Sequence, residues 1–215
     1  MNAKNSDTKN LRVISGSAKG RRLYFINAPG IRPFTDRIRE SLFTSLWNRA
    51  PRETVLDIFA GSGIFGIEAL SRGARSCTFV ENNARCTSVI QKNIALCGFS
   101  SAASIVSSDA ESWIFSRSPE TMSCDIITLD PPFGYGKQEN GRAIARMITR
   151  LVSVALSEGG TLIYQSERSE PSVSLLRETF PDLREKRFGR SNVVLLDAVS
   201  TACPQPEPNG DSAAT

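Results

Sequence analysis

The sequence predicts an α/β fold in which helices cover both faces of a mostly parallel sheet, preceded by a small basic unit. From Thr54 onward, short apolar strand patterns alternate with amphipathic helix patterns, and this alternation implies right-handed crossovers between parallel strands. A glycine-rich turn directly follows the first of these strands, as in many ligand-binding α/β sheets. Residues 11–52 lack the alternation and are expected to form a hairpin followed by a helix.

The N-terminal unit begins with two short apolar runs that carry several basic residues. Leu11–Ser15 and Arg21–Ile26 are the expected strands of this basic hairpin. Either Thr35 or Asp36 can cap a helix that extends to about Asn48. The apolar face expected on this helix consists of Ile38, Leu42, Phe43, Leu46 and Trp47.

The remaining elements follow from hydrophobic periodicity. The expected strands are Thr54–Ile58, Ser76–Glu81, Ala103–Ser107, Asp125–Leu129 and Thr161–Gln165. The expected helices are Ile64–Ser71, Ala84–Cys97, Ala110–Phe115, Glu139–Leu156 and Ser172–Thr179. One more strand is expected over Arg187–Ala198 after a bend at Gly189, and residues 1–10 and 200–215 have the composition of disordered tails.

Charge is distributed unevenly along the chain. Residues 1–52 carry 11 of the 26 Lys and Arg residues but 3 of the 22 Asp and Glu residues. A basic N-terminal part on a mildly acidic remainder predicts an anionic partner on that side. The alternative is a solvated charged face or a flexible tail.

Composition excludes several classes of function. The chain has no histidine, and its 5 cysteines form no Cys-x-x-Cys pair, so neither a zinc site nor a Ser-His-Asp triad is expected. No metal is predicted, and reduced, buried thiols are the simplest account of the cysteines. The sequence shows no secretory signal and no run of apolar residues long enough for a membrane span, and we expect a cytoplasmic protein.

The most informative motif is Asp130-Pro131-Pro132-Phe133, which follows an apolar run at 126–129. Proline cannot donate to a sheet ladder, so the strand is expected to end there. The carboxylate of Asp130 and the carbonyl of Pro131 can accept the two hydrogens of an exocyclic amine, while Phe133 stacks on the base that carries it. These three residues are the predicted catalytic set; the alternative is an ordinary surface turn after a strand.

The glycine turn is the second motif. Gly61, Gly63 and Gly66 match G-x-G-x-x-G, which is found in dinucleotide-binding proteins. Asp57, four residues before the first glycine, would repel a pyrophosphate. Its carboxylate suits a cofactor that carries a cationic group, such as the amino-acid end of S-adenosylmethionine. We therefore predict that Asp57, Gly61 and Gly63 bind S-adenosylmethionine.

Two further acids lie at or just after the ends of the next two strands. Glu81 ends the second expected strand and can accept hydrogen bonds from ribose hydroxyls. Asp109 follows the third expected strand and can bond an adenine amine. The alternatives are an exposed strand end for Glu81 and a helix N-cap for Asp109.

Together these residues resemble the class I S-adenosylmethionine-dependent methyltransferases that methylate amino groups. The N-terminal unit is similar, more narrowly, to the bacterial 16S rRNA guanine-N2 methyltransferases of the RsmD type. The segments that carry this resemblance are Arg12–Gly16, Lys19–Leu23 and Arg32–Phe43. Phe34 stands where that family usually has threonine.

The resemblance implies a Rossmann-like, seven-stranded sheet with an N-terminal extension. It also implies methylation of one guanine of 16S rRNA, within a partly assembled small subunit. The expected division is a basic RNA-binding extension at 11–52 and a methyltransferase domain at 53–199. The candidates for phosphate contacts are Arg12, Lys19, Arg21, Arg22, Arg32, Arg37 and Arg39, although Arg37 and Arg39 can instead pair with acids of the protein.

Three other functions remain open from the sequence. The Asp130 turn would hold the amine of adenine equally well, as in a DNA or RNA adenine-N6 methyltransferase. The glycine spacing alone would allow an NAD-dependent oxidoreductase. A non-catalytic RNA-binding assembly factor could use the same scaffold.

Overall fold

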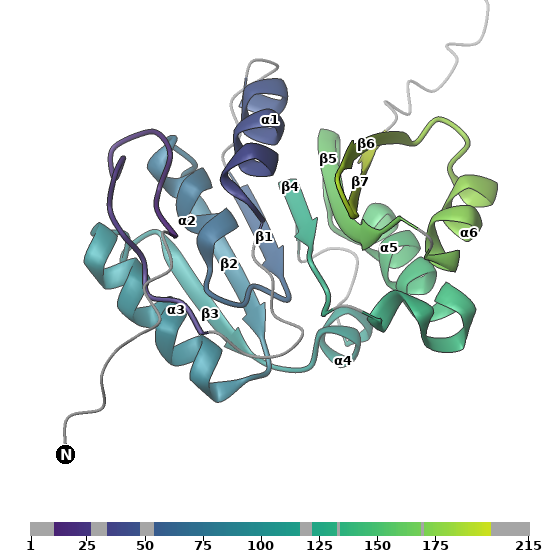
Figure 1. The fold of residues 1–215 in the computed structure, drawn as a ribbon. Helices are drawn as coiled ribbons and strands as arrows, with labels where there is room; N and C mark the ends of the chain where they lie inside the picture. Colours follow the sequence, from purple (N-terminus) through teal and green to yellow (C-terminus); the bar gives the residue numbers. More distant parts are fainter. Residues whose placement is uncertain are drawn as a thin grey trace, which may run out of the picture.

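The computed structural model describes residues 11–26, 34–47, 54–116, 122–132, 134–168 and 170–198. Its centre is a seven-stranded sheet in the order β3-β2-β1-β4-β5-β7-β6 (Figure 1). The strands are β1 (Thr54–Ile58), β2 (Ser76–Glu81), β3 (Ala103–Ser107), β4 (Cys124–Leu129), β5 (Leu156–Glu167), β6 (Arg184–Phe188) and β7 (Ser191–Asp197). Neighbouring strands are parallel from β3 to β5, whereas β7 is antiparallel to both β5 and β6. The predicted α/β, mostly parallel, seven-stranded sheet is confirmed.

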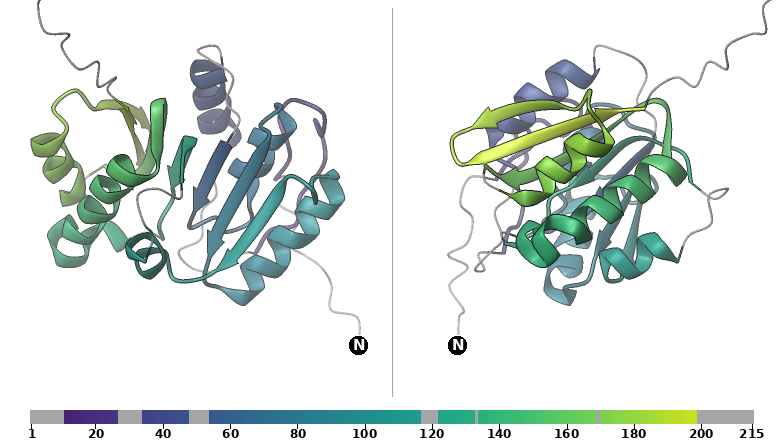
Figure 2. Two further views of the ribbon diagram at one scale, coloured as in Figure 1. Left: turned by 180° about the vertical axis from the view of Figure 1, so that it is seen from behind. Right: turned by 90° about the vertical axis from the view of Figure 1, so that its right-hand side faces the viewer.

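Helices cover both faces of this sheet (Figure 2). The helical elements are α1 (Asp36–Trp47), α2 (Ile64–Ser71), α3 (Ala84–Cys97), α4 (Ala110–Phe115), the 3-10 helix η2 (Tyr135–Gly141), α5 (Arg142–Val154) and α6 (Pro171–Thr179). Residues of α1, α2 and α3 pack in one hydrophobic cluster with alternate residues of the strands. Residues of α4, α5 and α6 pack in a second cluster with the intervening strand residues, because successive strand side chains point to opposite faces.

The long helix expected over Glu139–Leu156 is wrong at both ends. The 3-10 helix η2 occupies Tyr135–Gly141, α5 begins only at Arg142, and Leu156 already belongs to β5. Gly141, the last residue of η2, has φ of +85°, and a Cβ there would lie 2.3 Å from the backbone nitrogen of Ser172. The close approach of α6 therefore requires glycine at this position and interrupts the helix.

The C-terminal segment also differs from expectation. Arg187–Ala198 does not form one strand; instead β6 and β7 pair as an antiparallel hairpin. Gly189 turns between them with φ of +58°. The expected tails at 1–10 and 200–215 lie outside the described residues.

The N-terminal hairpin is less regular than predicted. One isolated bridge pairs Arg12 with Arg22, and Leu23 donates its backbone N–H to Leu11 at 2.8 Å. The segment nevertheless belongs to the main core, because side chains from residues 11–23 and 34–46 are buried in the same cluster as those of β1, β2 and α2.

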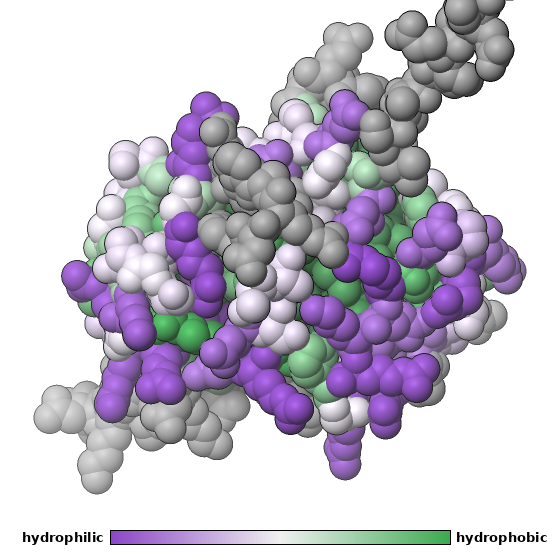
Figure 3. Space-filling view, turned by 90° about the horizontal axis from the view of Figure 1, so that it is seen from above, coloured by the Kyte–Doolittle hydropathy of each residue, from purple (hydrophilic) through white to green (hydrophobic). Residues whose placement is uncertain are grey.

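The molecular surface is a mixture of hydrophilic and hydrophobic residues. On the face shown in Figure 3, hydrophilic residues occupy much of the area, with hydrophobic residues visible between them. Within the described ranges, no helix combines the length and the apolar character needed to cross a membrane.

Candidate active site at the carboxyl edge of the sheet

Three parallel strands, β1, β2 and β4, bring the predicted site residues to one edge of the sheet, the lower edge in Figure 1. Their register places Ile58 beside Val80 on one side and Leu129 on the other. The residues that follow these strands therefore emerge close together. Ligands of open α/β sheets bind at this edge.

Asp57 is buried at the end of β1, with 2% of its surface exposed. Its carboxylate accepts a hydrogen bond from the backbone N–H of Gly66 at 3.1 Å. Burial raises the pKa of Asp57 to about 8; the Gly66 bond opposes this rise, and the charge of Glu81 adds to it. A buried carboxylate in this state gains from a nearby cation.

The glycine turn has a left-handed backbone at three positions, with φ of +59° at Phe59, +58° at Gly61 and +74° at Gly63. A non-glycine residue at such φ is unusual and is often found at functional sites. A Cβ added at Gly63 would lie 3.3 Å from Ile90 and Phe79, whereas one at Gly61 would meet only a carbonyl oxygen at 3.9 Å. Gly61 therefore faces open space, where a ligand can approach the backbone.

Glu81 supports this turn from β2. Its two carboxylate oxygens accept backbone N–H groups, one from Gly61 and one from Asn83, both at 2.9 Å. Glu81 is thus held in place at the base of the turn, which a merely exposed strand end would not be. Asp109 caps α4 by accepting the N–H of Ser112 at 2.9 Å, so the N-cap alternative applies; a ligand contact is compatible with it and stays a prediction.

Asp130 follows β4, and its backbone N–H donates to Ile58 at 3.3 Å. Among the described residues no group donates a hydrogen bond to its carboxylate. Burial raises the pKa of Asp130 well above its usual value, and the charge of Asp57 adds to the rise. Pro131 is partly buried beside it. Phe133 lies outside the described residues, so its stacking role stays a prediction.

The loop after Asp130 rests on a polar network that the sequence did not indicate. The hydroxyl of Tyr164, on β5, donates to Glu170 at 2.6 Å and lies 2.9 Å from the Ser172 hydroxyl. A Cβ at Gly136 would lie 2.1 Å from Glu170 and 2.8 Å from the Tyr164 oxygen. These contacts fix the position of η2. In sequence Tyr164 sits within an apolar strand pattern, and no local signal marks its partner six residues later.

The basic residues of the N-terminal segment divide into two groups. Those exposed to solvent are Arg12, Lys19, Arg21, Arg22 and Arg37. Arg12 also lies 3.5 Å from Asp36, and Arg21 donates to the carbonyl of Leu96 at 2.9 Å. Arg32 lies outside the described residues.

Arg39 is not available for a phosphate contact, and this part of the prediction is wrong. Its side chain is fully buried and forms ion pairs with Glu68 at 3.0 Å and Asp36 at 2.6 Å. It also donates to the carbonyls of Phe34 and Arg12. The alternative of pairing within the protein is the one observed, because helix periodicity turns this arginine toward the core.

Comparison with known proteins agrees with this architecture. The family model described as Conserved hypothetical protein 95 matches residues 11–197. The chain is 32% identical over 188 residues to "Putative rRNA methyltransferase YlbH" of Bacillus subtilis, covering 86% of this chain and 97% of that protein. It is 33% identical over 181 residues to ribosomal RNA small subunit methyltransferase D of Haemophilus influenzae, covering 83% and 89%.

Solved structures share the fold. "Putative methyltransferase yhhF from Escherichia coli" matches with a TM-score of 0.67 and 29% identity, covering 87% of this chain and 97% of that one. SMU.776, whose structure contains SAH, matches in fold with a TM-score of 0.62 at 16% identity, covering 82% and 58%. The chain therefore belongs to the Conserved hypothetical protein 95 family, the RsmD-type family of class I S-adenosylmethionine-dependent methyltransferases.

Proposed function

We propose that this protein transfers a methyl group from S-adenosylmethionine to the exocyclic N2 of one guanine in 16S rRNA of the small ribosomal subunit. The observation that carries the proposal is the Asp130 carboxylate, which no described residue engages, at the sheet edge beside Asp57. Family membership supports ribosomal RNA as the substrate class, because relatives named for that activity cover most of the chain.

The residues at the edge fit the proposed cofactor. Gly61 leaves its backbone open, and Asp57 is a buried acid that a cation would stabilise. Glu81 presents its carboxylate at the end of β2, and Asp109 presents one after β3. S-adenosylmethionine supplies an electrophilic methyl group on a positively charged sulfur. A cation near Asp57 and Asp130 favours their ionised forms, which is the form of Asp130 that accepts hydrogen bonds.

Asp130 and Pro131 then orient the target amine. The lone pair of this nitrogen is delocalised into the base, so it must be turned toward the methyl group. One N2 hydrogen bonds to the carboxylate of Asp130 and the other to the carbonyl of Pro131, while Phe133 fixes the plane of the base. Such positioning can lower a barrier by roughly 7–11 kcal/mol. The amine gives up one proton as the N–C bond forms, and Asp130 or water accepts it.

The basic N-terminal segment is the proposed RNA contact surface. Five of its exposed cationic side chains are available to phosphates: Arg12, Lys19, Arg21, Arg22 and Arg37. Phosphate contacts position the RNA without reading its sequence, and affinity should fall steeply with salt. We further propose that the protein acts in the cytoplasm on a partly assembled small subunit.

The test is incubation of the full chain with isotopically labelled S-adenosylmethionine and small subunits from cells that lack the enzyme. Mass spectrometry of the digested RNA should find labelled N2-methylguanosine at one position. The same incubation with DNA in place of the subunits tests the other substrate class. Labelled N6-methyladenosine in either nucleic acid would identify an adenine methyltransferase, and no label in either would exclude both activities. Naked 16S rRNA, tested in parallel, determines whether assembly is required.

A further inference from the structure

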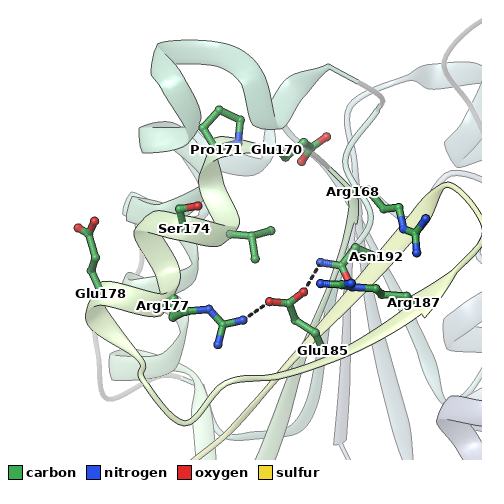
Figure 4. Close-up of a pocket in the computed structure, with 10 residues that line it drawn as sticks. Arg168, Glu170, Pro171, Ser174, Arg177, Glu178, Glu185, Arg187 and Asn192 are labelled. Carbon is green, nitrogen blue, oxygen red and sulfur yellow. Dashed lines mark hydrogen bonds and ion pairs between the residues drawn. The ribbon is translucent and has the colours of Figure 1, made fainter.

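A groove between helix α6 and the β6–β7 hairpin has so far been given no function (Figure 4). We call it the α6–β7 groove; it has a volume of about 480 Å³ and is lined by Arg168, Glu170, Arg177, Glu185, Arg187 and Asn192, among others. Glu170 belongs both to this groove and to the network that supports the loop after Asp130. The groove is therefore adjacent to the proposed active site.

Strand register defines how the groove and the active site are related. β4 pairs with β5 as far as Leu129 and Tyr164, and Asp130 follows Leu129 directly while Ser166 lies two residues beyond Tyr164. Ser166 of β5 pairs with Asn192 of β7, and Asn192 pairs with Arg187 of β6. Three strand spacings of about 4.8 Å span roughly 14 Å. One row of residues thus leads from the amine-binding turn to Arg187.

Two cations at one end of the groove have no partner. Arg168 and Arg187 are exposed, and neither forms an ion pair or hydrogen bond with any described residue. Figure 4 shows both beside Asn192, with Glu178 pointing away at the other end. Glu185 does not neutralise them, because its two oxygens already accept bonds from Arg177 and Asn192.

The floor of the groove contains an unsatisfied acceptor. Asn192 is 2% exposed, and its amide nitrogen donates to Glu185 at 3.0 Å. That bond fixes the orientation of the amide and leaves Oδ1 with no partner among the described groups. The hydroxyl of Ser166, its neighbour in register, is also buried and unpartnered. Buried polar groups in native proteins normally have a partner, so a ligand with a hydrogen-bond donor suits this floor.

We propose that the α6–β7 groove binds the ribose-phosphate backbone of the RNA strand next to the target guanine. Arg168 and Arg187 hold a phosphate, and the ribose 2′-hydroxyl donates to Oδ1 of Asn192. This inference rests on the proposed function and adds a contact that distinguishes RNA from DNA, since the 2′-hydroxyl is the group that differs. It also gives the substrate a second anchor on the side of the active site opposite the glycine turn.

The first test is the affinity of the full chain for a short single-stranded oligoribonucleotide, measured by fluorescence anisotropy at several salt concentrations. Arg168→Gln and Arg187→Gln should each weaken binding about threefold to tenfold, and the double variant should flatten the slope of log affinity against log salt by about 0.7, the value for one phosphate contact on a single strand. The matched control is Arg75→Gln, an exposed arginine before β2 at the opposite edge of the sheet. Both groove variants behaving like this control would overturn the phosphate site.

The second test compares RNA with DNA of the same sequence. Wild type should prefer RNA, and Asn192→Ala should reduce that preference about threefold to tenfold, as expected for one lost hydrogen bond. An unchanged preference would overturn the 2′-hydroxyl contact. Wild type binding RNA and 2′-deoxy RNA equally would do so as well, without relying on the stability of a variant.

The two proposals fail in different ways. If wild type transfers no label to ribosomal RNA, the proposed function fails. If wild type transfers label while Arg168→Gln and Arg187→Gln bind and methylate like wild type, the function stands and the α6–β7 groove proposal fails.

Discussion

The two halves of the sheet treat their polar side chains differently. In the β3-β2-β1 half, the acids of the site are already bonded to the protein: Glu81 to the glycine turn, Asp57 to the start of α2 and Asp109 to the start of α4. In the β4-β5-β7-β6 half, no described residue donates a hydrogen bond to the carboxylate of Asp130, and Oδ1 of Asn192 has no partner among the described residues. The acids of the first half are therefore held in place before any ligand binds, while Asp130 and Asn192 of the second half leave polar atoms for a ligand to satisfy.

The N-terminal segment is also held in place by hydrogen bonds and ion pairs to one acid, on the β3-β2-β1 side of the sheet. Glu68 of α2 accepts the backbone N–H groups of Ile14 and Ser15 at 2.7 and 3.0 Å. It also pairs with Arg39 at 3.0 Å and with Arg72 at 2.8 Å. One buried carboxylate thus connects the hairpin, α1 and α2, and the exposed arginines are presented from a fixed frame.

The largest effect should come from breaking this frame. Glu68→Ala leaves the Arg39 guanidinium buried without its main counter-ion, and removing one partner of a buried pair costs about 3–5 kcal/mol. Urea denaturation followed by circular dichroism should show this loss. Glu40→Ala, at an exposed position of α1, is the control and should change stability by less than about 0.5 kcal/mol. A Glu68→Ala protein as stable as this control would contradict the role of the network.

The next effect concerns activity alone. Asp130→Asn keeps the size of the side chain but removes the charge that accepts the amine, and we expect a loss of about 10²–10³ in kcat, comparable to the loss of other pre-organised electrostatic contacts. Because no described residue bonds to the Asp130 carboxylate, the melting temperature should not fall. Calorimetry should find a much smaller loss of cofactor affinity than of kcat, because Asp57, the acid assigned to the cationic group of the cofactor, is unchanged. Turnover close to wild type would remove Asp130 from the mechanism.

Sequence reasoning succeeded where the structure depends on local pattern. The strand, turn and helix over 54–71 follow from periodicity and glycine spacing, and the same spacing places Asp57 and Glu81 at one edge. The position of Asp130 follows from the two prolines that end β4.

The rest depends on contacts between residues far apart in the chain. Tyr164, Glu170 and Asn192 acquire their roles from the packing of α6 on β5 and β7, which no local pattern reports. Gly141 interrupts a helical pattern only because α6 approaches its backbone. Arg37 and Arg39 carry the same charge on the same helix, and the sequence does not distinguish them. The structure does, because Arg37 is exposed and Arg39 is buried.

The pH dependence of the free energy of unfolding tests the role of Asp57 in the β3-β2-β1 half of the sheet. Burial raises its pKa to about 8 in the folded protein, whereas the unfolded chain has a value near 3.9. Between these values the folded state binds more protons than the unfolded state, so the free energy of unfolding falls as pH rises from about 4 to 8. Asp57→Asn removes this term and should stabilise the protein without cofactor by on the order of 2 kcal/mol at pH 8.

Thermal melts of wild type and Asp57→Asn from pH 5 to pH 8.5 test this prediction. The two curves should diverge with rising pH, and parallel curves would contradict a raised pKa at Asp57. Cofactor affinity should move in the opposite direction, increasing with pH up to about 8 in wild type, because a bound cation prefers the ionised carboxylate. In Asp57→Asn the affinity should be lower and nearly independent of pH over this range.

The smallest effect is expected in the β4-β5-β7-β6 half of the sheet. The hydroxyl of Ser166 is buried without a partner among the described residues, so Ser166→Ala removes an unsatisfied group and should leave the free energy of unfolding unchanged or raise it by less than about 1 kcal/mol. Glu68 and Ser166 are both buried and polar. Both oxygens of Glu68 have partners, whereas the hydroxyl of Ser166 has none among the described residues. If urea denaturation showed that Ser166→Ala costs more than about 2 kcal/mol, this hydroxyl would already have a partner in the free protein. The polar side chains of the β4-β5-β7-β6 half would then be bonded within the protein like the acids of the other half. The affinity of the α6–β7 groove for RNA would have to come from its exposed arginines alone.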